Sequence, residues 1–452
     1  MKDYALIKYS KNRLEEFRSG IDRLHALGIT KDPEMGLKTS QITVTYPPTQ
    51  SLIPVTDKVD VYEDVSGRNT LYVHIPFCTG ICTYCGYSRS AASDGDEKVT
   101  SYQALLEKEA TLLSEKFNGQ KIPVESIYIG GGTPTLLSVS DLERMLQTVD
   151  RYFLLDQNGE YTLEGSPETM TSEKVKLSVS YGVNRASIGA ESFNDNVLRI
   201  IHRRHNSRGV FEAVEKIRNG GIENIDIDLI RGLPSYTFDM VLDDLRGIRT
   251  LGVQSVSSYQ YTVKPKTLDA KRKPELLSEE ELLQMHILFV AGMDKIGYTQ
   301  RPIDFYNIDK NHEFKHQLLK WSCQVNQLVL GIGCYGFISN TQFTNTTNRR
   351  KYEELINNGK LPVEKSFVLS PEELIRRDFL FGLKTEVDVQ GFHRRHNANL
   401  LDTYFSKDLE RLIESGAIEV SYDSIRLTEL GSLFADWIQC KFYSPSIKQT
   451  TI

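Results

Sequence analysis

The segment 72–85, YVHIPFCTGICTYC, joins an apolar strand to three closely spaced cysteines and decides the fold. The strand-like run Leu71–Ile75 precedes Cys78, Cys82 and Cys85, which have the spacing C-x3-C-x2-C. Three soft thiolates on one short loop can converge on one cubic iron–sulfur cluster. A ferredoxin-like carrier would need a fourth cysteine nearby, and the next thirty residues contain none. The fourth iron of such a cluster would therefore be open to a ligand other than a protein side chain.

Two other interpretations of these cysteines are a zinc site, with His74 as the fourth ligand, and plain burial in the core. Zinc fits poorly because structural zinc sites usually join two separated ligand pairs. The remaining cysteines, Cys323, Cys334 and Cys440, are scattered and are expected to pack in the interior. We therefore prefer the iron–sulfur cluster, in a reduced, cytoplasmic protein.

The composition is that of an ordinary folded protein. The chain has 452 residues, 60 acidic against 54 basic, and a formal net charge of −6. At ~150 residues per domain, this length suggests two or three domains or one large α/β barrel with additions. The mild acidic excess argues against a nucleic-acid binder. No apolar run reaches membrane-spanning length and no signal peptide is visible, so we expect no membrane partner.

Strand-like and helical stretches alternate along the middle of the chain, which predicts parallel β/α units. The expected strands are Leu71–Ile75, Ser126–Ile129, Glu160–Leu163, Arg185–Ile188, Asn224–Ile230 and Val253–Tyr259. The expected helices between them are Val99–Lys116, Val139–Phe153, Ser172–Val179, Arg208–Asn219 and Phe238–Leu251. Six strands are fewer than an eight-fold barrel needs, so we predict an α/β fold with a partial (β/α)6 barrel. The carboxyl ends of its strands should carry the chemistry.

The two ends of the chain differ from the barrel. Residues 1–68 are expected to form an N-terminal helical extension, helical over Lys11–Leu27, that covers the cavity, and residues 69–345 the barrel with an adjoining segment. Residues 346–452 should form a winged-helix-like α+β cap. Within it, Ser370-Pro371 marks the start of a helix. A helix to Glu414, a hairpin over 417–427 and a helix over 429–437 follow. A winged helix can bind DNA, but the acidic balance favours a substrate cap.

Several candidate functional residues stand at expected strand ends. The segment 130–135, GGGTPT, offers bare backbone to a ligand, although a tight turn without a ligand is the alternative. Glu164 follows the third strand and needs a partner, which is either a ligand or a barrel arginine. Asp226 and Asp228 lie on one face of the fifth strand. Their carboxylates are either functional or ion-paired within the barrel. Glu191 can pair with Arg203, twelve residues on. His202, His205, His393 and His396 stand in basic stretches and are expected on the solvated surface.

The segment 72–85 and the later motifs resemble the radical S-adenosylmethionine (SAM) superfamily. More closely, they are similar to the branch of oxygen-independent coproporphyrinogen III oxidase, which includes haem chaperones, haem-degrading enzymes and class C methyltransferases and cyclopropanases. The resemblance runs from about Tyr72 to the C-terminal region. It implies a 4Fe–4S cluster held by Cys78, Cys82 and Cys85, with SAM on the open iron. One electron from the cluster then releases a 5'-deoxyadenosyl radical.

The resemblance also implies roles for single residues. It places Tyr72, Glu191 and Arg203 in catalysis and implies two SAM molecules. The positions implied for SAM are Tyr72, Tyr84, Gly131, Gly132, Thr133, Glu164, Glu191, Arg203, Asp228, Thr262 and Phe337. Most relatives carry glutamine where this chain has Glu191, so this position departs from the family.

Three reactions stay open: methyl or other C1 transfer with two SAM molecules, decarboxylation of coproporphyrinogen III, and haem binding without turnover. The decarboxylase has a further cysteine where this chain has Tyr87, which counts against that activity. We prefer C1 transfer to an aromatic, heteroaromatic or tetrapyrrole substrate, by a monomer reduced by flavodoxin or ferredoxin.

Overall fold

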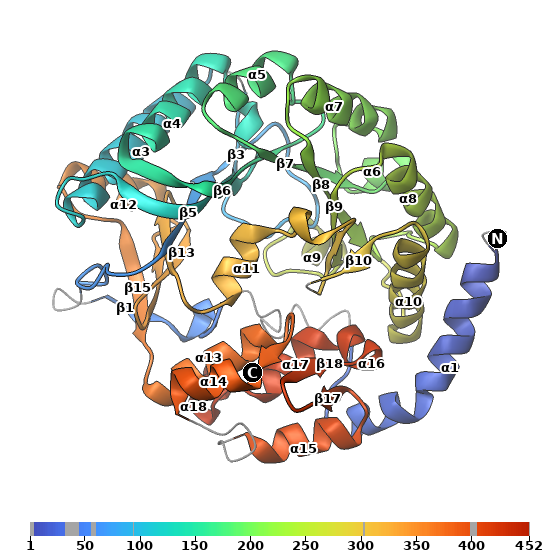
Figure 1. Cartoon of the computed structure of the whole chain (residues 1–452). Coiled ribbons are helices and arrows are strands. Elements are labelled where there is room, and N and C mark those ends of the chain that lie inside the picture. Colours follow the sequence, from blue (N-terminus) through green and yellow to red (C-terminus); the bar gives the residue numbers. More distant parts are fainter. Residues whose placement is uncertain are drawn as a thin grey trace.

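The computed structural model describes residues 4–31, 45–55, 60–93, 95–301, 303–397 and 405–451. Within these ranges, one sheet of thirteen strands has the order β1-β15-β14-β13-β12-β2-β5-β6-β7-β8-β9-β11-β10. Figure 1 shows helices in an arc around the strands of this sheet, with the C-terminal helices gathered to one side. The edge strands β1 and β10 do not pair with each other, so the barrel stays open.

The six predicted strands form the parallel part of the sheet, and the predicted α/β partial barrel is confirmed. They are β2 (Asn69–Ile75), β5 (Ile122–Gly131), β6 (Phe153–Gly165), β7 (Arg185–Glu191), β8 (Asn224–Arg231) and β9 (Ser255–Gln260). The five predicted helices are α3 (Glu97–Glu115), α4 (Val139–Tyr152), α5 (Ser172–Ser180), α7 (Ser207–Asn219) and α8 (Phe238–Leu251). Each begins at an Asp, Asn, Ser or Thr whose side chain accepts a hydrogen bond from the first turn.

A seventh parallel strand was not predicted. Strand β12 (Asn326–Leu330) pairs with β2 in the register Asn326↔Asn69 to Leu330↔Val73. The sheet continues antiparallel through β13 (Tyr335–Ile338), β14 (Thr341–Asn345), β15 (Val363–Val368) and β1 (Ile53–Pro54). At the other edge lie β11 (Phe305–Asn307) and β10 (Thr299–Gln300). Shorter helices fill the connections: α6 (Asp195–Ile200), α9 (Leu268–Arg272), α11 (Lys315–Trp321) and α12 (Arg349–Asn357).

The C-terminal part contains the expected helices and hairpin. Its elements are α13 (Pro371–Gly382), β16 (Val387–Asp388), α14 (Val389–His396), α15 (Ser406–Glu414), β17 (Ile418–Val420), β18 (Ser424–Leu427), α16 (Glu429–Leu433), α17 (Ala435–Lys441) and α18 (Pro445–Thr451). The small sheet has the order β16-β18-β17. The expected helix over 429–437 is two helices, because the chain leaves helical geometry at the buried Phe434. Since β15 belongs to the barrel sheet, we propose that the cap begins at Ser370 rather than at residue 346.

Helix α1 (Tyr4–Ala26) joins the barrel to the C-terminal part. It packs along α10 (Glu279–Lys295) and contacts α16. Beyond it, the Lys31 ammonium donates to the carbonyl oxygen of Leu433 over 2.8 Å. The expectation that the extension covers the cavity is wrong for the part of residues 1–68 that is described, because none of it lines the cysteine cavity. None of the described helices is long and apolar enough to span a membrane.

Candidate active site

The cysteine loop is held at its ends and in its middle. Strand β3 (Phe77–Cys78) pairs with β4 (Ser90–Ala91), which closes the loop into a short ribbon. In the middle, the backbone N–H of Thr83 donates to the carbonyl of Ile201 over 3.2 Å. The Thr83 hydroxyl donates to the Asp269 carboxylate over 3.0 Å, and the Asp269 N–H donates back to the Thr83 carbonyl over 3.0 Å. These contacts fix the loop between α6 and α9.

The three loop cysteines line one cavity of about 360 Å³ at the carboxyl ends of the strands. Burial raises the pKa of Cys78 to about 11 and also raises that of Cys85. A nearby positive charge is therefore needed to keep these groups as thiolates, and iron supplies one. One cation of the chain is also present, since Arg203 Nη1 lies 3.6 Å from Cys82 Sγ. The donor set fits the expected iron–sulfur cluster.

The zinc alternative fits the geometry poorly. Both ring nitrogens of His74 are engaged: Nδ1 lies 2.9 Å from the Tyr72 hydroxyl and Nε2 lies 3.1 Å from the Ser88 carbonyl oxygen. Among the described residues, no three His, Cys, Asp or Glu side chains converge tightly enough to hold one metal ion. In an iron–sulfur cluster each thiolate binds a different iron, so the three sulfur atoms lie farther apart than ligands of one metal ion do.

The glycine segment 130–132 packs directly against the strand that carries the cysteine loop. The Gly132 N–H donates to the Ile75 carbonyl over 2.8 Å, and the Thr133 N–H donates to the Phe77 carbonyl over 2.7 Å. A Cβ at Gly132 would lie 2.5 Å from the Phe77 oxygen. This close backbone contact requires glycine there whether or not a ligand binds.

Glu164 faces the cavity without an arginine partner. Its carboxylate accepts a hydrogen bond from the Gly131 N–H over 2.9 Å and another from the Tyr128 hydroxyl. Burial raises the pKa of Glu164. No described arginine forms an ion pair with this carboxylate, so a salt bridge to the barrel is not its role. The ligand interpretation of Glu164 stays a prediction.

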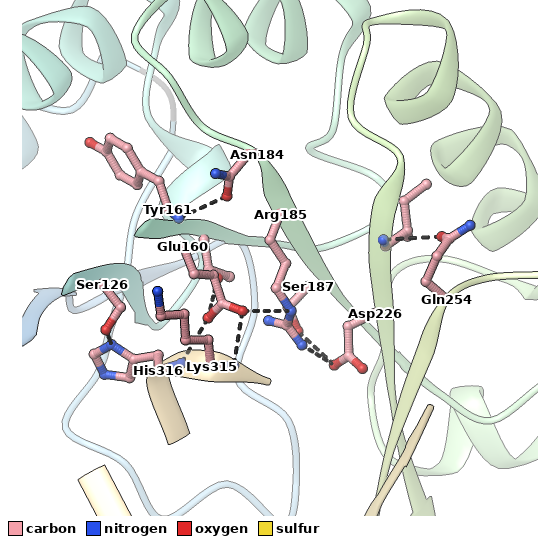
Figure 2. A network of polar contacts seen from close by, with 12 residues as sticks. Ser126, Glu160, Tyr161, Asn184, Arg185, Ser187, Asp226, Gln254, Lys315 and His316 are labelled. Atoms are coloured by element: carbon pink, nitrogen blue, oxygen red, sulfur yellow. Dashed lines mark hydrogen bonds and ion pairs between the residues drawn. The ribbon is translucent and has the colours of Figure 1, made fainter. Parts of the chain in front are cut away.

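The barrel arginine instead serves other carboxylates. Figure 2 shows Arg185 of β7 between Glu160 of β6 and Asp226 of β8, at 3.9 and 3.4 Å. Asp226 is therefore ion-paired within the barrel, as the alternative interpretation held. Asp228 differs, because it lines the cavity and accepts a hydrogen bond from the Ser187 hydroxyl over 2.8 Å.

The predicted pairing of Glu191 with Arg203 is confirmed. Arg203 Nη2 lies 3.5 Å from Glu191 Oε1 and also donates to the Gly189 carbonyl. Glu191 ends strand β7 with φ +64°, a left-handed conformation that is uncommon outside glycine. The left-handed turn and the ion pair place one carboxylate and one guanidinium beside Cys82.

The structure brings most predicted SAM-site residues to the same cavity. Its lining includes Tyr84, Gly131, Gly132, Thr133, Glu164, Glu191, Arg203, Asp228 and Thr262. Tyr72 instead lines a neighbouring cavity of about 240 Å³, which shares Gly131 and Glu164 with the first. Phe337 lines neither cavity; it is buried under the Arg377 guanidinium, 3.7 Å from its ring centroid. Its predicted place near SAM is therefore not supported by this geometry.

Two further cavity-side residues, Glu168 and Lys264, escaped the sequence analysis. Glu168 accepts a hydrogen bond from the Thr79 hydroxyl of the cysteine loop over 3.2 Å and lies 3.5 Å from Nδ1 of His205. Burial alone would raise the pKa of Glu168, but hydrogen bonds from His205 and Ser166 lower it to about 2. Lys264 follows β9 and also lines the cavity. Glu168 and Lys264 each stand just after a strand, so the strand-end rule applied to every strand would have found them.

The predicted burial or exposure is correct for some of the remaining histidines and cysteines and wrong for others. His205 is buried rather than solvated, because its Nε2 donates to the Ala190 carbonyl over 3.1 Å. His396 is half-buried and lies 2.6 Å from the Asp378 carboxylate, whereas His202 and His393 are exposed as expected. The packing of Cys334 and Cys440 is confirmed, and Cys323 is half-buried.

Comparisons with known proteins agree with this geometry. The model of the radical SAM superfamily matches residues 72–247. The haem chaperone HemW of Bacillus subtilis is 31% identical over 372 residues, which cover 81% of this chain and 96% of that relative. The oxygen-independent coproporphyrinogen III oxidase of Bradyrhizobium diazoefficiens is 26% identical over 375 residues, covering 79% and 82%. The structure of the Escherichia coli coproporphyrinogen III oxidase HemN superposes with a TM-score of 0.75 at 24% identity, over 84% of this chain and 91% of that one.

Membership of this superfamily implies a 4Fe–4S cluster and SAM, and the cysteine cavity offers thiols of the right kind and number for the former. The chain belongs to the radical SAM superfamily, in the branch that contains the HemW haem chaperones and the oxygen-independent coproporphyrinogen III oxidases.

Proposed function

We propose that this chain is a radical SAM protein that binds a tetrapyrrole beside its cluster. One observation carries the proposal: a single cavity collects the three cysteines, the glycine segment and the buried carboxylate Glu164. When bound, the cluster supplies the electron that cleaves the sulfonium of SAM. The tetrapyrrole comes from the relatives, whose printed names are haem chaperone and coproporphyrinogen oxidase.

The residues of the chain suit the binding of SAM in distinct ways. Cys78, Cys82 and Cys85 would hold the cluster. Glu164 presents a carboxylate that could accept a hydrogen bond from the SAM ammonium, and the Gly131–Gly132 backbone leaves room for that contact. Arg203 would place a positive charge beside Cys82 and hold Glu191 in its left-handed turn.

Among the three reactions, the comparisons favour a haem chaperone over the methyltransferase that the sequence suggested. Five HemW proteins are 25–31% identical to this chain, and their average identity is above the 26% of the compared oxidase. The matches cover 94–96% of the length of these HemW proteins and 82% of that oxidase. Tyr87 also stands where the decarboxylase has its additional cysteine. We therefore propose, as the leading function, stoichiometric haem binding without SAM cleavage that depends on the tetrapyrrole. We also propose that the protein is a monomer in the cytoplasm.

Methyl transfer is the second candidate because of one specific observation. The cavity of the cysteines is also lined by the positions that the resemblance assigns to a second SAM, which are Tyr84, Thr133, Glu191, Arg203 and Asp228. In that reaction the 5'-deoxyadenosyl radical from one SAM would take a hydrogen atom from the methyl group of the second, which would supply the transferred carbon and leave as S-adenosylhomocysteine. The two candidates differ in their products and can be separated directly.

The test uses anaerobically reconstituted protein with SAM, reductant and either haem or coproporphyrinogen III. A chaperone binds haem stoichiometrically and forms no 5'-deoxyadenosine that depends on the tetrapyrrole. A methyltransferase forms both 5'-deoxyadenosine and S-adenosylhomocysteine in the same reaction, and a decarboxylase releases carbon dioxide. Absence of both haem binding and SAM cleavage, in protein with a full cluster, would overturn the proposal. Cys85→Ala is the matched control without a complete cluster.

A further inference from the structure

A second cavity adjoins the cysteine cavity, and the proposed binding of the cluster and SAM does not account for most of its lining. Its volume is about 240 Å³. The residues that it shares with the first cavity are Tyr87, Gly131, Glu164 and Tyr259. Sites that enclose a whole drug-sized ligand usually measure ~300–1,000 Å³. The second cavity is therefore of a size to hold a small ligand or one part of a larger one.

Aromatic rings form much of the wall of this second cavity. The ring centroids of Tyr72 and Tyr128 lie 6.0 Å apart at an interplanar angle of 21°, and the Phe314 ring lies 5.5 Å from that of Tyr128. Tyr87 and Tyr259, which line both cavities, keep 61% and 40% of their surfaces exposed. Uncovered rings of this kind offer flat apolar contacts to a ring of a ligand. The wall therefore suits a planar ring.

One cation faces the second cavity. Lys320, at the end of α11, is the one lysine or arginine among the described residues that line it, and Lys320 does not line the cysteine cavity. Its Nζ lies 4.8 Å from the centroid of the Tyr335 ring and forms neither a hydrogen bond nor an ion pair with any described residue. Glu164, the one carboxylate in this lining, is bonded to Gly131 and Tyr128 instead. The half-buried amine of Lys320 thus lacks an anion.

The surroundings of Lys320 carry an excess of positive charge. Burial, with help from Arg377 and Lys384, lowers the pKa of Lys320 to about 7. Lys384 is paired with Asp436 at 3.2 Å. Arg377 is 2% exposed, lies over the Phe337 ring and forms no ion pair with a carboxylate of the described chain. An anion beside Lys320 would offset this excess and favour the charged amine.

We propose that the second cavity binds a carboxylate attached to a planar ring, with the Lys320 ammonium donating a hydrogen bond to the carboxylate and the tyrosine rings contacting the ring. The inference deepens the proposed function and rests on it for the source of that group. In a tetrapyrrole, one pyrrole ring and its carboxylate arm enter the second cavity from the cysteine cavity. A free single-ring carboxylic acid has the same chemistry and is the other source.

A single amine also sets the class of anion and the specificity. Phosphate recognition in proteins commonly uses several converging donors, whereas a carboxylate can be held by one ammonium and the apolar contacts of its ring. A ligand of the same shape without the charge would leave Lys320 unpaired, which costs binding free energy. Lys320 is therefore a specificity-determining residue of this cavity.

The test measures binding to the reconstituted full-length protein with SAM and without reductant, so that no turnover occurs. Haem and haem dimethyl ester are compared by absorbance titration, and phenylpropionate and phenylpropanamide by calorimetry. Wild type should bind the acid of each pair about tenfold or more tightly than its neutral counterpart, through one charge-assisted hydrogen bond. Lys320→Met should weaken binding of the acids by about the same factor and leave the neutral compounds unchanged.

Lys315→Met is the matched control on the same helix. The Lys315 ammonium donates to the Asn158 carbonyl over 2.9 Å and does not line the cavity, so this variant should bind all four compounds as wild type does. Equal binding of acid and neutral compound by wild type, or an unchanged preference in Lys320→Met, would overturn the proposal. So would an equal loss of both members of a pair in Lys320→Met, because a lost charge contact affects the acid alone.

The two pairs of compounds separate this inference from the proposed function. If phenylpropionate shows the preference that depends on Lys320 and haem does not bind, the carboxylate site stands, a free acid is its source, and the tetrapyrrole function fails. If haem binds no more tightly than its ester and phenylpropionate no more tightly than its amide, tetrapyrrole binding stands and the carboxylate site is wrong.

Discussion

The guanidinium of Arg203 lies 3.5 Å from the carboxylate of Glu191, and its other terminal nitrogen lies 3.6 Å from the sulfur of Cys82. One side chain thus connects a residue at the end of β7 to the cysteine loop. The family resemblance implies glutamine at position 191, so the ion pair can be probed by the conservative substitution of Glu191 by glutamine.

Glu191→Gln removes the charge and keeps the shape of the side chain. We expect cluster loading and SAM cleavage to be retained, because Arg203 keeps its bond to the Gly189 carbonyl. For the second candidate, methyl transfer, the ratio of 5'-deoxyadenosine to methylated tetrapyrrole should change several-fold, measured by mass spectrometry. Loss of iron from this variant would show that Glu191 supports the cysteine loop rather than a bound SAM.

Replacement of the cysteines separates the cluster ligands from the packed thiols. Cys78→Ala, Cys82→Ala and Cys85→Ala should each lose the 4Fe–4S cluster, whereas Cys323→Ala should keep about four irons per chain. Iron and sulfide analysis after anaerobic reconstitution, with the 400-nm region of the absorbance spectrum, provides the measurement. Full iron in all three loop variants would refute the assignment of the ligands.

Gly132→Ala tests whether the glycine segment supports the loop. The added Cβ would meet the Phe77 oxygen at 2.5 Å and the Phe77 nitrogen at 2.8 Å, and backbone atoms cannot move aside cheaply. We expect a loss of ~1–3 kcal/mol in the free energy of unfolding and weaker cluster loading. Gly209→Ala is the control, since its Cβ would meet no atom closer than 3.6 Å. Equal stability of the two variants in urea would contradict the prediction.

Because of Lys31, the free energy of unfolding should rise with pH above pH 7. Burial, with help from Arg231, lowers the pKa of Lys31 to about 7, whereas an unfolded lysine titrates near 10.4. Between these values the unfolded chain holds a proton that the folded chain lacks, so stability rises with pH by ~1.4 kcal/mol per pH unit for this group. It is constant below pH 7.

Lys31→Met should remove this rise. The free energy of unfolding is measured in urea at pH 7.5 and 9.0 under anaerobic conditions. The quantity compared is the difference between variant and wild type at each pH. The exposed Lys360→Met is the control and should follow wild type at both pH values. A difference between Lys31→Met and wild type that stays constant with pH would rule out a neutral Lys31.

The sequence predicted the barrel because each strand is a short apolar run and each helix has a polar capping residue, which are local signals. It missed β12 (Asn326–Leu330), whose apolar run is only Leu328–Leu330 after two amide residues, a weaker local signal than in the other strands. The site was predicted where residues stand at strand ends, as Glu191 does at the end of β7. It failed for Phe337, whose burial under Arg377 depends on the C-terminal part.

Strand β2, which leads into the cysteine loop, is bonded on one side to β5 and on the other to β12. The last of these partners is synthesised some 250 residues after the first cysteine. Until then β2 can pair only with β5, and one edge of the strand that leads into the cysteine loop is unpaired. We therefore expect stable cluster binding to require the pairing of β12 with β2, and a chain that ends before Asn326 to hold the cluster less firmly.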